Sequence, residues 1–113
     1  MYTLYGISNC DTVKKARRWL EAHHIEYTFR DMRKPPIESK EIKALLTLVD
    51  WQELLNKKSR TWRELPDSDK DNINKTSAIH LLQEQPTLIK RPVLVKGKTV
   101  LIGFDETAYK KLT

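Results

Sequence analysis

The chain has 113 residues, of which 39% are apolar and 32% are charged, and 21 Lys and Arg against 15 Asp and Glu give a formal net charge of +6. This length supports one hydrophobic core rather than two, and the composition excludes a disordered chain. No apolar run is long enough to span a membrane, and no basic stretch followed by an apolar one opens the sequence. We therefore expect one globular, cytoplasmic, monomeric domain.

The positive charge would attract a small anionic ligand, an acidic protein or nucleic acid. The basic residues are dispersed along the chain, and no nucleic-acid-binding motif accompanies them. Most of these charges are therefore expected on the solvated surface, and nucleic acid is not an expected partner.

A β-α-β unit is predicted at the N-terminus. Residues 2–7 are strand-like, residues 25–31 alternate and are rich in β-formers, and between them apolar residues recur at helical spacing from Thr12 onward. Asn9 or Asp11 is expected to cap this helix. Two strands and a helix in so short a segment favour a parallel pair with a right-handed crossover.

The middle of the chain is predicted to be helical. Pro35-Pro36 breaks the chain first. The expected elements are a helix over 42–49, a short continuation over 51–55 capped by Asp50, a loop over 56–60, a turn or short helix start at 66–69, and a helix from about 76 that ends at Pro86.

The C-terminal segment returns to β-structure. Residues 93–95 and 99–102 are strand-like and flank a turn at 96–98, which predicts a hairpin. Asp105 is then expected to cap a last helix. The predicted order is βαβ, helices, ββα, with an all-helical insertion at about 37–89 within a single domain of residues 1–113.

Cys10 is the only cysteine, and it lies where the first strand gives way to the first helix. Unpaired backbone N–H groups and the positive end of the helix dipole favour an anion at such a position. A thiolate is such an anion, and helix starts together with nearby Arg or Lys lower the pKa of cysteine. The placement predicts a working thiol, against the alternative of a small buried hydrophobe.

Four spaced blocks carry a resemblance to a known family: Leu4 to Thr12, Trp51 to Asn56, Ile89 to Pro92, and Gly103-Phe104. Together with the element order they resemble the arsenate reductase-like family (ArsC and Spx), and within it the YffB-like branch, over essentially the whole chain. The resemblance implies an α/β, thioredoxin-like fold with an all-helical insertion after the second strand.

The resemblance also implies roles for particular residues. In arsenate reductases of this class a cysteine attacks the arsenic, glutathione resolves the adduct, and three arginines hold the oxyanion. Cys10 matches the nucleophile, and Arg91 matches the arginine before the family's proline, here Pro92, which is usually cis. The other two arginines lack clear counterparts, since Asn56 and Gly103-Phe104 stand near the expected positions. Arsenate reduction is therefore an alternative.

A second alternative follows from the Spx regulators. These bind RNA polymerase and commonly sense redox state through a Cys-x-x-Cys pair. Here the position three residues after Cys10 is Val13, so an internal disulfide switch of that type is impossible. RNA polymerase is an expected partner only if the chain is a non-enzymatic regulator of this kind.

The interpretation we favour is a glutathione-dependent thiol–disulfide reductase. If Cys10 attacks a disulfide, a second thiol must release the product, and with no other cysteine in the chain that thiol comes from outside. We expect glutathione as co-substrate, a disulfide or small anion as substrate, and no metal or bound organic cofactor. Cys10 and Arg91 are the expected catalytic residues. The expected substrate- and glutathione-binding residues are Asn9, Thr12, Lys58, Arg60 and Pro92.

Overall fold

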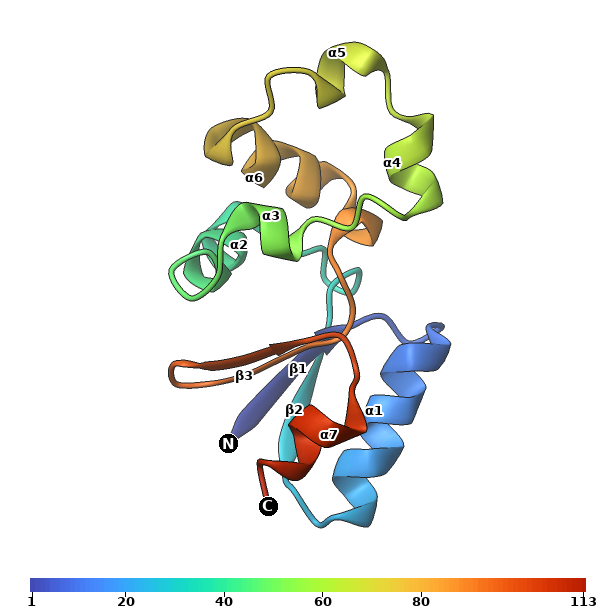
Figure 1. The fold of residues 1–113 in the computed structure, drawn as a ribbon, viewed down its shortest axis with the longest axis vertical. Coiled ribbons are helices and arrows are strands. Elements are labelled where there is room, and N and C mark those ends of the chain that lie inside the picture. The colour runs from blue at the N-terminus through green and yellow to red at the C-terminus, as the bar shows by residue number, and fades with distance from the viewer. The chain divides into compact units, whose positions relative to one another are not determined.

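The computed structural model describes all residues from Met1 to Thr113, which form two compact units. Unit 1 comprises residues 1–35 and 91–113, and unit 2 comprises residues 36–90. In Figure 1 unit 1 contains the labelled strands with α1 and α7, and unit 2 contains the helices labelled α2 to α6. Both chain termini therefore belong to unit 1.

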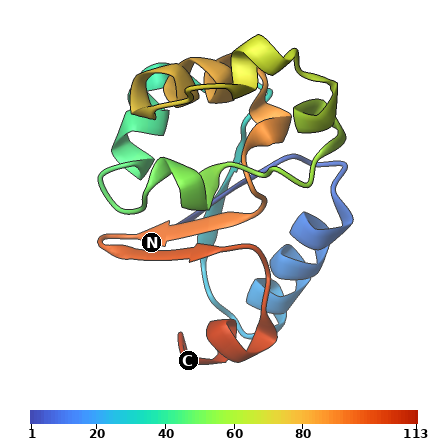
Figure 2. The ribbon, with the colours of Figure 1, turned by 45° about the horizontal axis from the view of Figure 1, so that its top comes forward.

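Unit 1 is built on a mixed four-stranded sheet with the strand order β2-β1-β3-β4. The strands are β1 Tyr2–Gly6, β2 Tyr27–Asp31, β3 Val93–Lys96 and β4 Thr99–Ile102. β1 runs parallel to β2, whereas β3 is antiparallel to both β1 and β4. β3 and β4 form a hairpin (Figure 2). Its two-residue turn contains Gly97, whose φ of +58° favours glycine.

Two helices, α1 (Asp11–Ala22) and α7 (Glu106–Lys110), pack on one face of this sheet. Leu4 and Leu94 are register partners in β1 and β3, so their side chains share that face. The buried cluster contains Leu4, Ala16, Trp19, Leu20, Leu94 and Tyr109. Removing this apolar surface from water is the main stabilising contribution to unit 1.

The predicted β-α-β unit and C-terminal hairpin are confirmed, with small shifts at the ends. β2 begins at Tyr27 rather than at residue 25. The chain reverses at His24, whose φ is +56°, and the Ile25 N–H then donates to the Leu20 carbonyl at 3.0 Å, so this residue belongs to the turn. Asp105 caps α7 as predicted, since its Oδ1 accepts from the Thr107 N–H at 3.1 Å.

Unit 2 is helical, as the sequence predicts. It contains α2 (Ser39–Leu45), α3 (Trp51–Leu54), α4 (Arg60–Glu64), α5 (Asp67–Lys70), α6 (Lys75–Glu84) and the 3-10 helix η1 (Pro86–Leu88). α6 packs against α2, α3 and η1, and α4 packs against η1. The buried side chains of these helices are aliphatic: Ile42, Leu45, Leu54, Ala78, Leu82 and Leu88.

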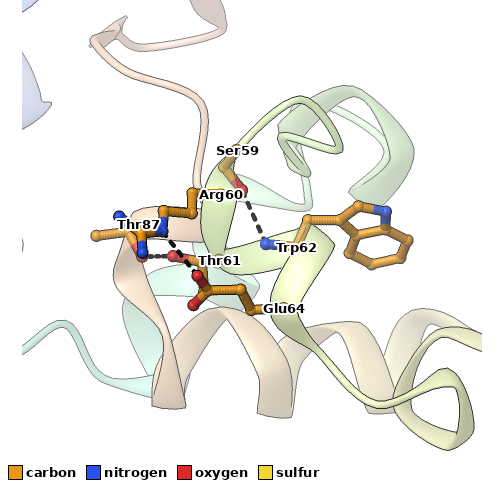
Figure 3. Close-up of polar contacts among 6 residues, drawn as sticks. All are labelled: Ser59, Arg60, Thr61, Trp62, Glu64 and Thr87. Carbon is orange, nitrogen blue, oxygen red and sulfur yellow. Dashed lines mark hydrogen bonds and ion pairs between the residues drawn. The ribbon is translucent and has the colours of Figure 1, made fainter.

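The loop predicted over residues 56–60 extends one residue too far, because α4 begins at Arg60. Ser59 is the N-cap of this helix, and its hydroxyl accepts from the Trp62 N–H at 3.2 Å. A hydroxyl contact of 2.8 Å between Thr61 and Thr87 ties α4 to η1 (Figure 3). The cap and this contact stabilise a helix that hydrophobic periodicity alone does not indicate.

The helical unit 2 lies between β2 and β3 in the chain, at the place of the predicted insertion. The single domain of residues 1–113 stays a prediction. None of the helices combines the length and the apolar character that crossing a membrane requires.

Candidate active site around Cys10

The first turn of α1 lies close to the end of β1 because the strand ends in a glycine. A Cβ on Gly6 would lie 2.9 and 3.0 Å from the two methyl groups of Val13, closer than real Cβ atoms approach their neighbours. The Gly6 carbonyl accepts from the Met32 N–H at 2.9 Å, which brings the turn after β2 to the same place. The segment that leads into Cys10 is therefore held between β1, α1 and the end of β2.

Cys10 is the N-cap of α1, with extended backbone dihedrals of −114° and 123°, and its carbonyl accepts from the Lys14 N–H at 3.0 Å. The predicted caps are therefore wrong: Asn9 precedes the N-cap, and Asp11 is the first helical residue. The extended backbone needed before a first helical turn occurs at the cysteine itself. Asp11 still places an acidic group in the first turn, where the helix dipole favours it.

The environment of Cys10 lowers the pKa of its thiol. Partial burial alone would raise this pKa, but the Val13 N–H, the hydrogen bond and positive charge of Arg91, and the Thr12 N–H together outweigh it. No conventional side-chain cap bond is formed at this helix start. The N–H groups of the first turn instead favour the charged form of the sulfur, and this form is the nucleophile.

Arg91 reaches Cys10 from the C-terminal part of the chain that belongs to unit 1. The Arg91-Pro92 peptide bond is cis, which confirms the expectation from the resemblance. The Pro92 carbonyl accepts from the Gly103 N–H at 2.8 Å, so the start of β3 is tied to the end of β4. The guanidinium of the half-buried Arg91 hydrogen-bonds the Cys10 sulfur. The structure thus brings together two of the predicted site residues from distant parts of the sequence.

Asn9 and Thr12 lie on either side of Cys10, and both are exposed. The contribution of Thr12 to the thiolate comes from its backbone N–H, and a role for its hydroxyl stays a prediction. The Asn9 amide oxygen accepts from Nη2 of Arg33 at 2.8 Å. No sequence motif marks Arg33, although parallel pairing of β1 with β2 brings together the residues that follow the two strands.

Lys58 and Arg60 belong to unit 2, and both are exposed. Nε of Arg60 donates to Oε1 of Glu64 at 2.7 Å, one helical turn along α4 (Figure 3). The Lys58 backbone N–H donates to the Asn56 side chain at 3.1 Å. Their assignment to the site stays a prediction.

Taken together, the mixed sheet, the cysteine at the start of α1 and the cis-proline at the start of β3 define a thioredoxin-like α/β protein with a helical insertion. The ArsC family matches residues 5–112 of this chain. The chain therefore belongs to the ArsC family.

Individual relatives agree with this family assignment. An uncharacterized protein of Haemophilus influenzae is 44% identical over 110 residues, which is 97% of this chain and 96% of that protein. A solved structure named YFFB protein is 40% identical, with a TM-score of 0.92 over 98% of this chain and 97% of its own. The global transcriptional regulator Spx of Enterococcus faecalis is 30% identical over 113 residues, 98% of this chain and 85% of that protein.

A more distant structure supports the fold alone. The glutaredoxin of Archaeoglobus fulgidus has 20% sequence identity and a TM-score of 0.50 over 98% of this chain and 83% of its own. Because one relative at 30% identity is a global transcriptional regulator, membership of the family does not by itself choose between catalysis and regulation.

Proposed function

We propose that this protein is a glutathione-dependent thiol–disulfide reductase in which Cys10 is the nucleophile. The observation that carries the proposal is the pKa of Cys10, which is lowered by two backbone N–H groups and by Arg91 although partial burial opposes ionisation. A lowered pKa increases the thiolate fraction near neutral pH, and thiol–disulfide exchange requires the thiolate.

The proposed reaction has two steps. The Cys10 thiolate attacks the glutathione sulfur of a mixed disulfide, so a sulfur–sulfur bond to Cys10 forms and the substrate leaves as a thiolate that takes a proton. A second glutathione thiolate then attacks this intermediate, which releases oxidised glutathione and regenerates the Cys10 thiolate. In the net reaction one mixed disulfide and one glutathione thiol give the free substrate thiol and one oxidised glutathione. The external thiol is needed because Cys10 is the only cysteine.

Arg91 serves both steps in this proposal. Its positive charge stabilises the Cys10 thiolate before the attack and again when that thiolate leaves in the second step. Its planar guanidinium also suits a carboxylate of glutathione. Backbone groups beside Pro92 are proposed to bind the extended peptide of glutathione. Thr12 and Asn9, with Lys58 and Arg60, complete the proposed binding residues, and the proposed setting is a monomer in the cytoplasm.

The test measures the rate of Cys10 alkylation against pH, and then turnover of a glutathione mixed disulfide coupled to glutathione reductase. We expect an alkylation midpoint below the ordinary cysteine pKa, and turnover that depends on glutathione. Cys10→Ser should abolish turnover. The matched control is a double variant, Cys10→Ser with Ser8→Cys. Its single thiol lies at an exposed position two residues before position 10. This control should show an unshifted midpoint and no turnover, with an unchanged circular dichroism spectrum. An unshifted midpoint in the wild type would contradict the thiol mechanism.

A non-enzymatic regulator is the second candidate, because a relative of 30% identity is a global transcriptional regulator. Such a protein would bind RNA polymerase, and Cys10→Ser would leave the binding intact. Retained binding together with absent turnover would favour this candidate.

Arsenate reduction with glutathione is the third candidate. The same comparison of the wild type with Cys10→Ser tests it, with arsenate as substrate.

A further inference from the structure

We propose that Arg33, held by Asn9, forms an anion-recognising subsite beside Cys10, which selects disulfides that carry a carboxylate near the sulfur. The inference rests on the proposed function and extends it by naming a specificity-determining residue and a substrate class. Arg33 lies in the turn after β2, outside the four sequence blocks that carry the family resemblance.

The position of Arg33 follows from one contact between two elements. Its Nη2 donates to Oδ1 of Asn9 at 2.8 Å, and Asn9 immediately precedes Cys10 in the chain. Both side chains are exposed, so a ligand can reach the guanidinium. The contact places a permanent positive charge on the side chain of the residue that precedes the nucleophile in the chain.

The turn that carries Arg33 is fixed by several bonds. Met32 is fully buried, and its N–H donates to the Gly6 carbonyl at 2.9 Å. The Arg33 N–H donates to Oδ1 of Asp31 at 2.9 Å, and Nη1 of Arg30 donates to the Pro35 carbonyl at 2.7 Å. The backbone is held on both sides of Arg33, and the hydrogen bond to Asn9 restricts its side chain, so less conformational entropy is lost when the guanidinium binds an anion.

The chemistry of the guanidinium determines the ligand class. Arginine presents five N–H donors in a plane, and the Asn9 oxygen receives one of them. A planar fork of donors matches a carboxylate, which accepts two parallel hydrogen bonds. Asp11 is exposed in the first turn of α1, and its negative charge repels an anion at the same helix start. Arg33 adds a second positive charge to that of Arg91, which offsets this repulsion and favours anionic substrates.

The direct test compares two alkylating probes of different charge, iodoacetate and iodoacetamide, at one pH. The thiolate fraction cancels in the ratio of their rates, so the ratio reports the charge that surrounds Cys10. We expect Arg33→Gln to lower the ratio of iodoacetate to iodoacetamide roughly threefold, the effect of one charge several ångströms away in water. Moderate salt should lower the wild-type ratio toward that of the variant.

Arg18→Gln is the matched control, because it removes the same charge from an exposed position of α1. Residue 18 lies eight residues beyond Cys10, about 12 Å of helix rise and more than a Debye length at 0.15 M salt. This variant should leave the ratio unchanged. Equal ratios for Arg33→Gln and the wild type, or equal losses in both variants, would overturn the inference.

Two further variants separate the effect of the Arg33 charge from the effect of its hydrogen bond to Asn9. Arg33→Lys should keep most of the ratio, because the charge remains, whereas Asn9→Ala should lower it, because the guanidinium is released from its position. If Asn9→Ala leaves the ratio unchanged, the hydrogen bond from Arg33 to Asn9 does not hold the charge in place.

In turnover, Arg33→Gln should raise the KM for a glutathionylated peptide about threefold and leave kcat unchanged. Absent turnover with an intact alkylation pattern would contradict the proposed function alone, whereas normal turnover with no effect of Arg33→Gln would contradict this inference alone.

Discussion

The start of α1 in unit 1 and the start of α4 in unit 2 are both rich in positive charge, yet they use it differently. At α1, Arg33 and Arg91 come from distant parts of the chain, and they bind Asn9 and the Cys10 sulfur. At α4, Arg60 pairs with Glu64 four residues away, with both side chains largely exposed. Exposed pairs of that kind contribute at most about 1 kcal/mol. The charge of Arg91, which comes from a distant part of the chain, lowers the pKa of the Cys10 thiol, whereas the charge of Arg60 is paired within its own helix.

The largest effect in this comparison is expected from Arg91→Gln. The substitution removes the side-chain hydrogen bond and the positive charge that lower the pKa of Cys10, so this pKa should rise. The rate of alkylation at pH 7 should fall on the order of tenfold, the loss expected for one hydrogen bond to a charged group. The dependence of the rate on pH, measured with iodoacetamide, checks the expected shift of the midpoint to higher pH.

Arg60→Gln is the matched control for that experiment. It also removes one arginine, but this arginine is 84% exposed in its side chain and paired within α4. The alkylation midpoint of Cys10 should be the same as in the wild type. A shift as large as that of Arg91→Gln would mean that net charge, rather than a specific contact, sets the pKa.

The next effect concerns how unit 1 positions the thiol. Gly6→Ala would place a methyl group 2.9 Å from one methyl of Val13, so the start of α1 must shift. Overpacking of this kind costs about 1–3 kcal/mol in the free energy of unfolding, which urea denaturation measures. The displaced helix start should also slow Cys10 alkylation at neutral pH.

The double variant Gly6→Ala with Val13→Ala tests the cause of that loss. Val13→Ala removes both methyl groups that the new Cβ would meet, at the cost of a cavity of its own. The double variant should therefore lose less stability than the sum of the two single variants. Additive losses would show that the contact with Val13 is not the source of the strain.

Much of the fold was predictable from the sequence because local signals agree with the final structure. The strands predicted at residues 2–7, 93–95 and 99–102 are rich in β-branched, aromatic and other apolar residues and lie next to turns, so all three were correctly predicted. The helix α4 was not predicted, since it has five residues and no buried side chain. A helix this short depends on its cap and on tertiary contacts, which a periodic pattern does not reveal.

The site was predictable in part, for a related reason. Cys10 and Arg91 were found because one is the single cysteine and the other precedes a proline in a motif of the family. Arg33 carries no motif, and only the parallel register of β1 and β2 brings it to Asn9. The cap at Cys10 was missed because asparagine and aspartate are the usual N-caps, whereas the backbone here places the cysteine at that position.

The starts of two helices provide a smaller test of the same comparison. α6 begins with a full capping box, in which Oδ1 of Asn74 accepts from the Ser77 N–H and Oγ of Ser77 accepts from the Asn74 N–H, both at 2.9 Å. Asn74→Ala should cost about 1 kcal/mol in the free energy of unfolding. Asp50 is the N-cap of α3, as the sequence predicts, but its side chain makes no cap hydrogen bond. Asp50→Ala should therefore change the free energy by less than about 0.5 kcal/mol.

A small effect of the opposite sign at neutral pH is expected in the core of unit 1, which differs from unit 2 in burying a phenol. Tyr109 is fully buried, packs edge-on against Trp19 and Phe104, and its hydroxyl has no hydrogen-bond partner. Tyr109→Phe keeps the ring contacts and removes a polar group that gains nothing from burial. Thermal unfolding at pH 7 should show a variant at least as stable as the wild type, by up to about 1 kcal/mol.

Alkaline pH should widen that small difference. Burial raises the pKa of Tyr109 from its ordinary value near 10 to about 12 in the folded protein. Between these two values the unfolded chain loses this proton while the folded protein keeps it, so rising pH favours unfolding until the folded phenol also ionises near 12. The wild type should therefore lose more stability than Tyr109→Phe between pH 10 and 12. Urea denaturation of both proteins across this window measures the difference, and parallel losses would show that the phenol hydroxyl is hydrated rather than isolated in the core.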